Sequence, residues 1–174
     1  MILALPSLES QPFDVKAKNL YNITVLIPII LGSESDKAHA EKISKVLAEF
    51  GVPYEIKVLS AHKVPELCFE YVKEMNKKAD VVYITCAGRS NGLSGVISGS
   101  SVHPVIACPP FSDKADYLAN IHSSVLMPSD TPAMTVADPQ NAALAAVKIL
   151  ALKDKTLADK VAARIADVKG KFKI

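Results

Sequence analysis

Three short turns rich in small and polar residues could do chemistry in this chain. The turns at residues 32–36, 60–63 and 87–95 come directly after runs with the apolar character of buried strands. In a parallel sheet the carboxyl ends of the strands share one edge, and open α/β sheets bind their ligands at that edge. The sequence therefore predicts that the three turns together form one ligand site.

The first turn, Gly-Ser-Glu-Ser-Asp at residues 32–36, has groups that suit a phosphorylated sugar. The hydroxyls of Ser33 and Ser35 and free backbone N–H groups at a helix start are able to hold a phosphate. The carboxylate of Asp36 accepts hydrogen bonds, such as those from ribose hydroxyls. A tight turn in which Ser35 or Asp36 caps the next helix explains the same residues, and the sequence leaves both interpretations open.

The second turn, Ser-Ala-His-Lys at residues 60–63, contains a candidate proton carrier. Histidine exchanges protons near neutral pH, so His62 is a candidate general base or acid. Lys63 balances the charge of a phosphate, with Ser60 beside it. An exposed loop histidine and lysine is the plainer alternative, and proximity to the first turn favours the functional interpretation.

The third turn supplies hydrogen-bond donors for a small anion or for carbon dioxide. Gly88 permits the backbone to approach a ligand closely, and Arg89, Ser90 and Asn91 carry donor groups. A helix cap next to a surface arginine is the alternative explanation for these residues.

The sequence lacks the motifs of several other kinds of functional site. It has no phosphate-binding P-loop, no dinucleotide-binding glycine fingerprint and no nucleophile elbow. The histidines at positions 39, 62, 103 and 122 are scattered, which argues against a metal site. We interpret His103 and His122 as structural, and Asp113 and Asp116 as solvated loop carboxylates.

Composition predicts one soluble globular domain. The chain has 174 residues, 49% of them hydrophobic and 22% charged, with a net charge of +2 and 6% aromatic residues. Neither nucleic acid nor a membrane is an expected partner, because no basic face or bilayer-spanning apolar run is evident. Three isolated cysteines are typical of a reducing compartment and predict a cytoplasmic location.

The pattern of apolar residues predicts alternating strands and helices from residue 23 onward. The order β-α-β-α-β-α-β is followed by a loop-rich region at 111–132, a short strand near 134–137 and a helix at 138–152. We expect a three-layer α/β/α sandwich with a flavodoxin-like parallel sheet. An extra C-terminal helix at 154–170 would complete a single domain at 23–174, after an N-terminal extension at 1–22.

The three turns, in this order and at these spacings, resemble the phosphoribosylaminoimidazole carboxylase family of purine biosynthesis. The runs at 104–110 and 123–129 fit as well, so the resemblance covers about residues 25–152. One branch of that family rearranges N5-carboxyaminoimidazole ribonucleotide, and typically has Ser-Ala-His-Arg in its second motif and a histidine in its third. Lys63 and the sequence Ala-Gly-Arg-Ser-Asn at 87–91 are instead similar to the branch that carboxylates aminoimidazole ribonucleotide directly with carbon dioxide.

The resemblance implies a carboxy-lyase that needs no ATP, metal, biotin or other cofactor. In that role Ser33, Ser35, Asp36, Ser60 and Lys63 would bind the ribose phosphate. Gly88, Arg89, Ser90 and Asn91 would hold carbon dioxide and the new carboxylate, and His62 would take the proton from C4 of the substrate. The family also implies a homo-octamer, and 174 residues leave no room for the synthetase domain fused to animal members.

Three alternatives remain open from the sequence. The first is the mutase branch, which shares the fold and the product. The second is a non-catalytic module that binds a mononucleotide or a flavin, which the scarcity of aromatic residues disfavours. The third is a structural assembly protein, in which no reaction would require His62.

Overall fold

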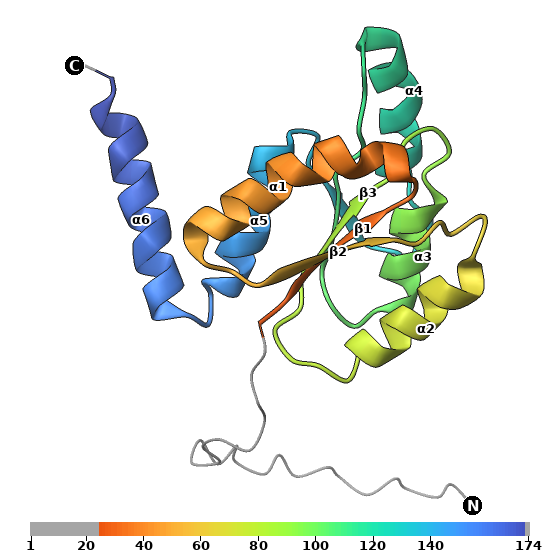
Figure 1. Ribbon diagram of the computed structural model, residues 1–174, viewed down its shortest axis with the longest axis horizontal. Helices are drawn as coiled ribbons and strands as arrows, with labels where there is room; N and C mark the ends of the chain where they lie inside the picture. Colours follow the sequence, from red (N-terminus) through yellow and green to blue (C-terminus); the bar gives the residue numbers. More distant parts are fainter. Residues whose placement is uncertain (1–24, 173–174) are drawn as a thin grey trace, which may run out of the picture.

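A five-stranded parallel sheet forms the centre of the molecule. The computed structural model describes residues 25–172, so the predicted extension at 1–22 lies outside the described residues. The strands, in the order β2-β1-β3-β4-β5 across the sheet, confirm the flavodoxin-like prediction (Figure 1). Their bounds are β1 Ile27–Leu31, β2 Tyr54–Val58, β3 Tyr83–Cys86, β4 Val105–Ala107 and β5 Ala133–Thr135.

Successive side chains of a strand point to opposite faces of the sheet, so the core is divided into two layers, one on each face. Ile29 of β1 and Ile84 of β3 point to the face covered by α1 (Lys37–Phe50) and α5 (Pro139–Leu150). Ile30 and Tyr83 point to the opposite face, against α2 (Pro65–Met75) and α3 (Gly92–Ser100). The predicted three-layer sandwich is therefore confirmed.

The region at 111–132 differs from its predicted loop-rich character, because it contains the helix α4 (Lys114–Val125). Asp113, predicted to be a solvated loop carboxylate, is the N-cap of this helix and accepts the backbone N–H of Asp116 at 2.9 Å. The buried residues of α4 are Asn120 and Ser124. Since its inner face is polar, the helix lacks the apolar period by which amphipathic helices are found in a sequence.

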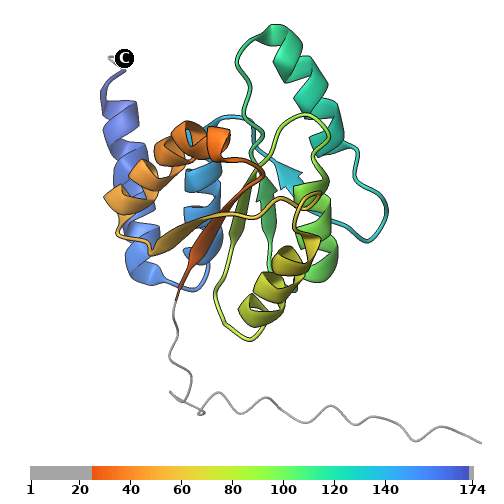
Figure 2. The same ribbon diagram turned by 45° about the vertical axis from the view of Figure 1, so that its right-hand side comes forward.

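The C-terminal helix α6 (Lys155–Gly170) confirms the predicted final helix. Its first half packs on the body through Leu157 and Val161, which are buried, and Lys160 Nζ donates to the carbonyl of Phe50 at 2.8 Å. Its second half stands out from the body in two views (Figures 1 and 2). Among residues 25–172, no helix combines the length and apolar content needed to cross a bilayer.

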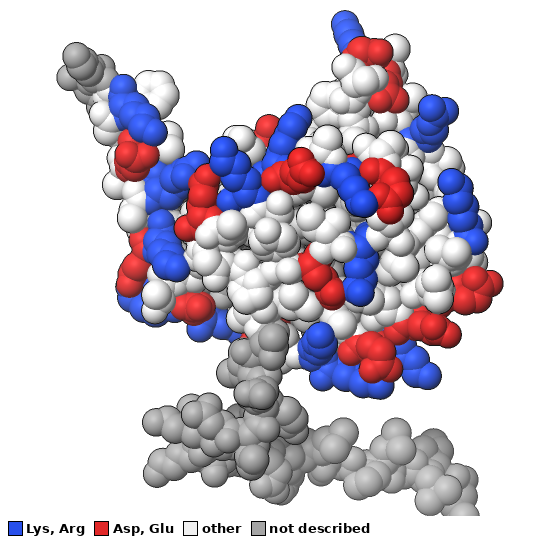
Figure 3. All heavy atoms as spheres, viewed as in Figure 1, with Lys and Arg blue, Asp and Glu red and all other residues white. Residues whose placement is uncertain are grey.

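Charged side chains of both signs are interspersed over the face shown in Figure 3. No broad area of one sign appears on that face, so it lacks the basic stripe by which nucleic-acid-binding surfaces are recognised.

Candidate active site

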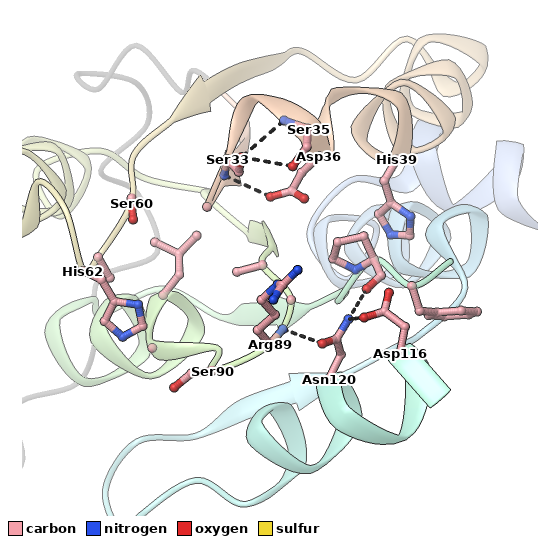
Figure 4. A pocket seen from close by; sticks show the side chains of 18 of the residues that line it. Ser33, Ser35, Asp36, His39, Ser60, His62, Arg89, Ser90, Asp116 and Asn120 are labelled. Carbon is pink, nitrogen blue, oxygen red and sulfur yellow. Dashed lines mark hydrogen bonds between the residues drawn. The ribbon is translucent and has the colours of Figure 1, made fainter. Parts of the chain in front are cut away.

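The chain reverses its direction across the sheet between β1 and β3, and a cavity lies at that point. From β1 the chain moves outward to β2, and it then returns to place β3 on the other side of β1. The crevice outside the carboxyl ends at such a switch point is where open α/β sheets bind ligands. The structure has a cavity of about 870 Å³ there (Figure 4).

The three predicted turns all contribute to this cavity. Every predicted site residue except Asn91 lines it: Ser33, Ser35, Asp36, Ser60, His62, Lys63, Gly88, Arg89 and Ser90.

The first turn is held by a reciprocal pair of hydrogen bonds. Ser33 is the N-cap of a short 3-10 helix at Glu34–Asp36, and its Oγ accepts the backbone N–H of Ser35 at 3.3 Å. The carboxylate of Asp36 accepts the backbone N–H of Ser33 at 3.0 Å, which completes a capping box. Ser33 therefore caps the 3-10 turn, whereas Asp36 is the N-cap residue of α1, as the sequence allowed, although its side chain makes no cap hydrogen bond to that helix.

Asp36 lies partly buried at the wall of the cavity. Burial raises the pKa of its carboxyl above the ordinary 3.8, although hydrogen bonds from Ser33 and Ser35 act in the opposite direction. The folded protein therefore holds a carboxylate in a place where desolvation opposes its charge. Polar partners from a ligand would relieve that cost.

His62 lies on the turn after β2 and faces the start of α3. A Cβ atom added to Gly92 would lie 2.7 Å from His62 Nε2, closer than two such atoms can approach. The imidazole therefore lies against the start of α3, and a larger residue at position 92 would require it to move. This contact brings His62 to the third turn, although His62 itself is exposed to solvent.

The third turn is held by α4. Arg89 has a φ of +57°, in the left-handed region that costs a non-glycine residue about 1–2 kcal/mol. Its backbone N–H donates to Asn120 Oδ1, and its carbonyl accepts a hydrogen bond from Ser123 Oγ. These bonds stabilise a backbone conformation that the turn alone would not favour.

Asn91 lies beneath the turn, outside the cavity lining. Its side chain caps α3, because Oδ1 accepts the backbone N–H of Ser94 at 3.2 Å. Its Nδ2 donates to Ser94 Oγ at 2.8 Å and to Ser124 Oγ at 3.0 Å. The alternative of a helix cap thus describes the side chain of Asn91 in this structure, and a direct role in binding stays a prediction.

The sequence did not single out several polar residues of the cavity, among them His39, Asp116 and Asn120. His39 lies on α1, and its Nε2 is 3.2 Å from Cys108 Sγ. Burial and the nearby Lys42 lower the pKa of His39. The position of His39 one helical turn after Asp36 was a usable signal, whereas Asp116 and Asn120 depend on α4.

The two cysteines near the cavity are poorly suited to act as nucleophiles. Burial raises the pKa of Cys108 to about 12 and that of Cys86 well above its ordinary value, so both thiols stay protonated at neutral pH. Within the described residues, no group of three or more His, Cys, Asp or Glu side chains is placed to hold a metal ion.

Comparison with known proteins identifies the family. Residues 26–171 match the family model described as AIR carboxylase. The chain belongs to the AIR carboxylase family. This result confirms the predicted resemblance and the prediction of a carboxy-lyase of purine biosynthesis.

Relatives of the chain carry the names of both branches. It is 49% identical over 133 residues to a phosphoribosylaminoimidazole carboxylase of Archaeoglobus fulgidus, covering 76% of this chain and 73% of that protein. It is 48% identical to an N5-carboxyaminoimidazole ribonucleotide mutase of Methanocaldococcus jannaschii, covering 78% and 85%. The crystal structure of Treponema denticola PurE superposes with a TM-score of 0.79 at 43% identity, covering 84% and 92%.

Burial of Asp36 predicts a stability that depends on pH. Because the folded protein binds the Asp36 proton more tightly than the unfolded chain, this carboxyl stabilises the fold below pH 3.8, and that contribution is lost as pH rises through the raised pKa. An Asp36→Asn side chain stays neutral and can still accept the N–H of Ser33. We expect its free energy of unfolding to exceed that of the wild type at about pH 7, with the difference shrinking toward acid.

Urea titrations across pH measure this difference, and Asp130→Asn is the matched control. Asp130 is exposed and also has a positive φ, which asparagine tolerates, so its variant should show no such trend. A lower stability of Asp36→Asn than of the wild type at every pH would mean that the hydrogen bonds of the carboxylate outweigh its burial.

Proposed function

We propose that this enzyme joins carbon dioxide to C4 of 5-aminoimidazole ribonucleotide and forms 4-carboxy-5-aminoimidazole ribonucleotide reversibly. The observation that carries the proposal is the contact of His62 with Gly92, because it sets an imidazole beside the third turn and this imidazole would accept the proton. A base and a small-molecule subsite within one cavity are what such a carboxylation requires.

The first two turns fit the ribose phosphate of the substrate. The hydroxyls of Ser33, Ser35 and Ser60 and the ammonium of Lys63 line the same cavity and supply donors for a phosphate. The partly buried carboxylate of Asp36 gains hydrogen bonds from ribose hydroxyls. A bound nucleotide is thereby held with its base directed to the third turn.

The chemistry then needs one new bond and one proton transfer. The aminoimidazole ring is an enamine, so its C4 attacks the carbon of carbon dioxide and a C–C bond forms. The proton on C4 passes to the imidazole of His62 in its neutral form, and the ring regains its aromatic character. In the reverse direction the imidazolium returns the proton to C4 and carbon dioxide leaves.

The new carboxylate is anionic, and the third turn supplies groups to hold it. Gly88, Arg89 and Ser90 line the cavity, and Arg89 offers a positive charge. Donors fixed before the reaction stabilise charge that develops during it. Carbon dioxide is reactive enough that positioning and removal of water supply the remaining catalysis.

The direct carboxylase is favoured over the mutase by two motif positions. Lys63 and the sequence Arg-Ser-Asn at 89–91 match the branch that uses carbon dioxide. The mutase remains the second candidate, because relatives with that name reach 48% identity.

The location and assembly of the enzyme are part of the same proposal. The described cysteines Cys68, Cys86 and Cys108 are free and buried, which supports a reducing compartment such as the cytoplasm. Exposed apolar side chains on α4 and β5, among them Val125 and Met134, support burial between subunits of a homo-octamer.

The role of His62 predicts a selective loss of turnover. In His62→Asn the amide keeps the size and polarity of the side chain but does not accept the C4 proton. We expect kcat to fall about 10²- to 10⁴-fold while the Kd for the nucleotide changes less than about threefold. His122→Asn is the control, because His122 is exposed on α4 and does not line the cavity. Near-normal turnover of His62→Asn would refute the assignment.

The choice of branch predicts which substrate gives product. Aminoimidazole ribonucleotide with bicarbonate and no ATP should yield the 4-carboxy product, detected by chromatography. N5-carboxyaminoimidazole ribonucleotide is supplied in a separate reaction. The enzyme should form the 4-carboxy product from it no faster than this compound decomposes to aminoimidazole ribonucleotide. Product from the second substrate alone would assign the chain to the mutase branch. Product from neither would favour a module that binds nucleotides without catalysis.

A further inference from the structure

We infer that Asn120 is a positioning residue that orients the third turn so that its free donors face the cavity. The inference rests on the function proposed above and adds a residue outside the sequence motifs that define the site. The side-chain amide of Asn120 links two loops of the cavity.

Asn120 is 3% exposed and lies on α4 at the wall of the cavity. Its Oδ1 accepts the backbone N–H of Arg89. Its Nδ2 donates to the carbonyl of Pro110 at 2.7 Å and to Asp116 Oδ1 at 3.2 Å. A single side chain therefore joins the loop after β3 to the loop after β4, with both ends of the amide in use (Figure 4).

The contacts with α4 fix the orientation of the two peptide groups on either side of Arg89. The N–H of Arg89 is directed to Asn120, and the carbonyl of Arg89 is occupied by Ser123 Oγ. By contrast, none of the described residues accepts a hydrogen bond from the backbone N–H of Gly88 or Ser90. The turn is thus anchored on the side of α4, and two donors remain for a ligand in the cavity.

The spacing at Gly88 shows how closely Asn120 and the turn are fitted. A Cβ atom at position 88 would lie 2.9 Å from Asn120 Nδ2. Only a glycine lets the backbone approach the amide this closely. Loss of the amide would release a residue, Arg89, that is held in the left-handed region, and the peptide groups on either side of Arg89 would lose a contact that fixes their orientation.

A carboxylate is the ligand group that these donors suit. The substrate has no carboxylate before the reaction, whereas the 4-carboxy product has one. Asn120 should therefore matter for the product and for the transition state that leads to it, and much less for the ribose phosphate held by the first two turns.

The test compares Asn120→Leu, Asn120→Asp and a matched control. The leucine variant keeps the approximate volume and removes both halves of the amide. The aspartate variant keeps an acceptor for the N–H of Arg89. Asn76→Leu is the control, because Asn76 also bridges backbone groups, donating to the carbonyl of Ser100 at 2.9 Å and accepting the N–H of Val102 at 3.2 Å. It follows α2 and does not line the cavity.

We expect Asn120→Leu to lower kcat about 10²-fold, as displacement of a positioned group does. Its Kd for the 4-carboxy product should rise about tenfold or more, while its Kd for aminoimidazole ribonucleotide changes less than about threefold. Asn120→Asp should recover only part of the lost kcat, because its second carboxylate oxygen does not donate to the carbonyl of Pro110 and faces the carboxylate of Asp116. Asn76→Leu should keep the wild-type kcat and both affinities, whatever its effect on the unfolding midpoint.

A folded Asn120→Leu with wild-type kcat would overturn the inference. An equal loss of affinity for both nucleotides would also overturn it. Such a result would mean that the substitution loosens the whole cavity and does not act on the carboxylate, which only the product has. If the wild type itself binds neither nucleotide and forms no product, the proposed function fails and takes this inference with it. A wild type that is active beside an unaffected Asn120→Leu refutes the role of Asn120 alone.

Discussion

The backbone N–H of Gly32 donates to the carbonyl of Cys86 at 2.8 Å, and this bond joins the end of β1 to the end of β3. Position 32 is so close to Ala87 that an added Cβ would lie 3.1 Å from the Ala87 methyl carbon. The first and third turns are therefore held against each other by the same ladder that builds the sheet. Because β2 pairs with the other side of β1, its turn arrives at the same edge and brings His62 with it.

The cavity depends equally on α4, which belongs to neither face of the sandwich. Its polar inner face supplies Asn120, Ser123 and Ser124 to the backbone and side chains of the third turn. Polar contacts suit this place better than apolar ones, because the turn presents backbone N–H and C=O groups, and α4 pairs both of those of Arg89. These contacts keep Arg89 in a sparsely populated conformation, and Asp36 is partly desolvated in the first turn; both are local costs that the rest of the fold supports.

The strands and the shared site at their carboxyl ends could be predicted from the sequence, because they follow from the apolar runs and from the polar turns after those runs. The runs before residues 32, 60 and 87 predicted parallel strands, and the turns after them predicted a shared site. Helix α4 was missed because its buried residues, Asn120 and Ser124, are polar. The position of Asn91 under the turn and the contact of His39 with Cys108 depend on the three-dimensional course of the backbone, which no local pattern encodes.

The most direct test of this account is a crystal structure of the enzyme with the 4-carboxy product bound. The account predicts the phosphate among Ser33, Ser35, Ser60 and Lys63 and the carboxylate on the N–H groups of Gly88 and Ser90. The C4 atom should lie about 3–3.5 Å from a ring nitrogen of His62. A nucleotide bound with C4 beyond the reach of His62, or with its carboxylate directed away from the third turn, would contradict the claim that the three turns form one active site.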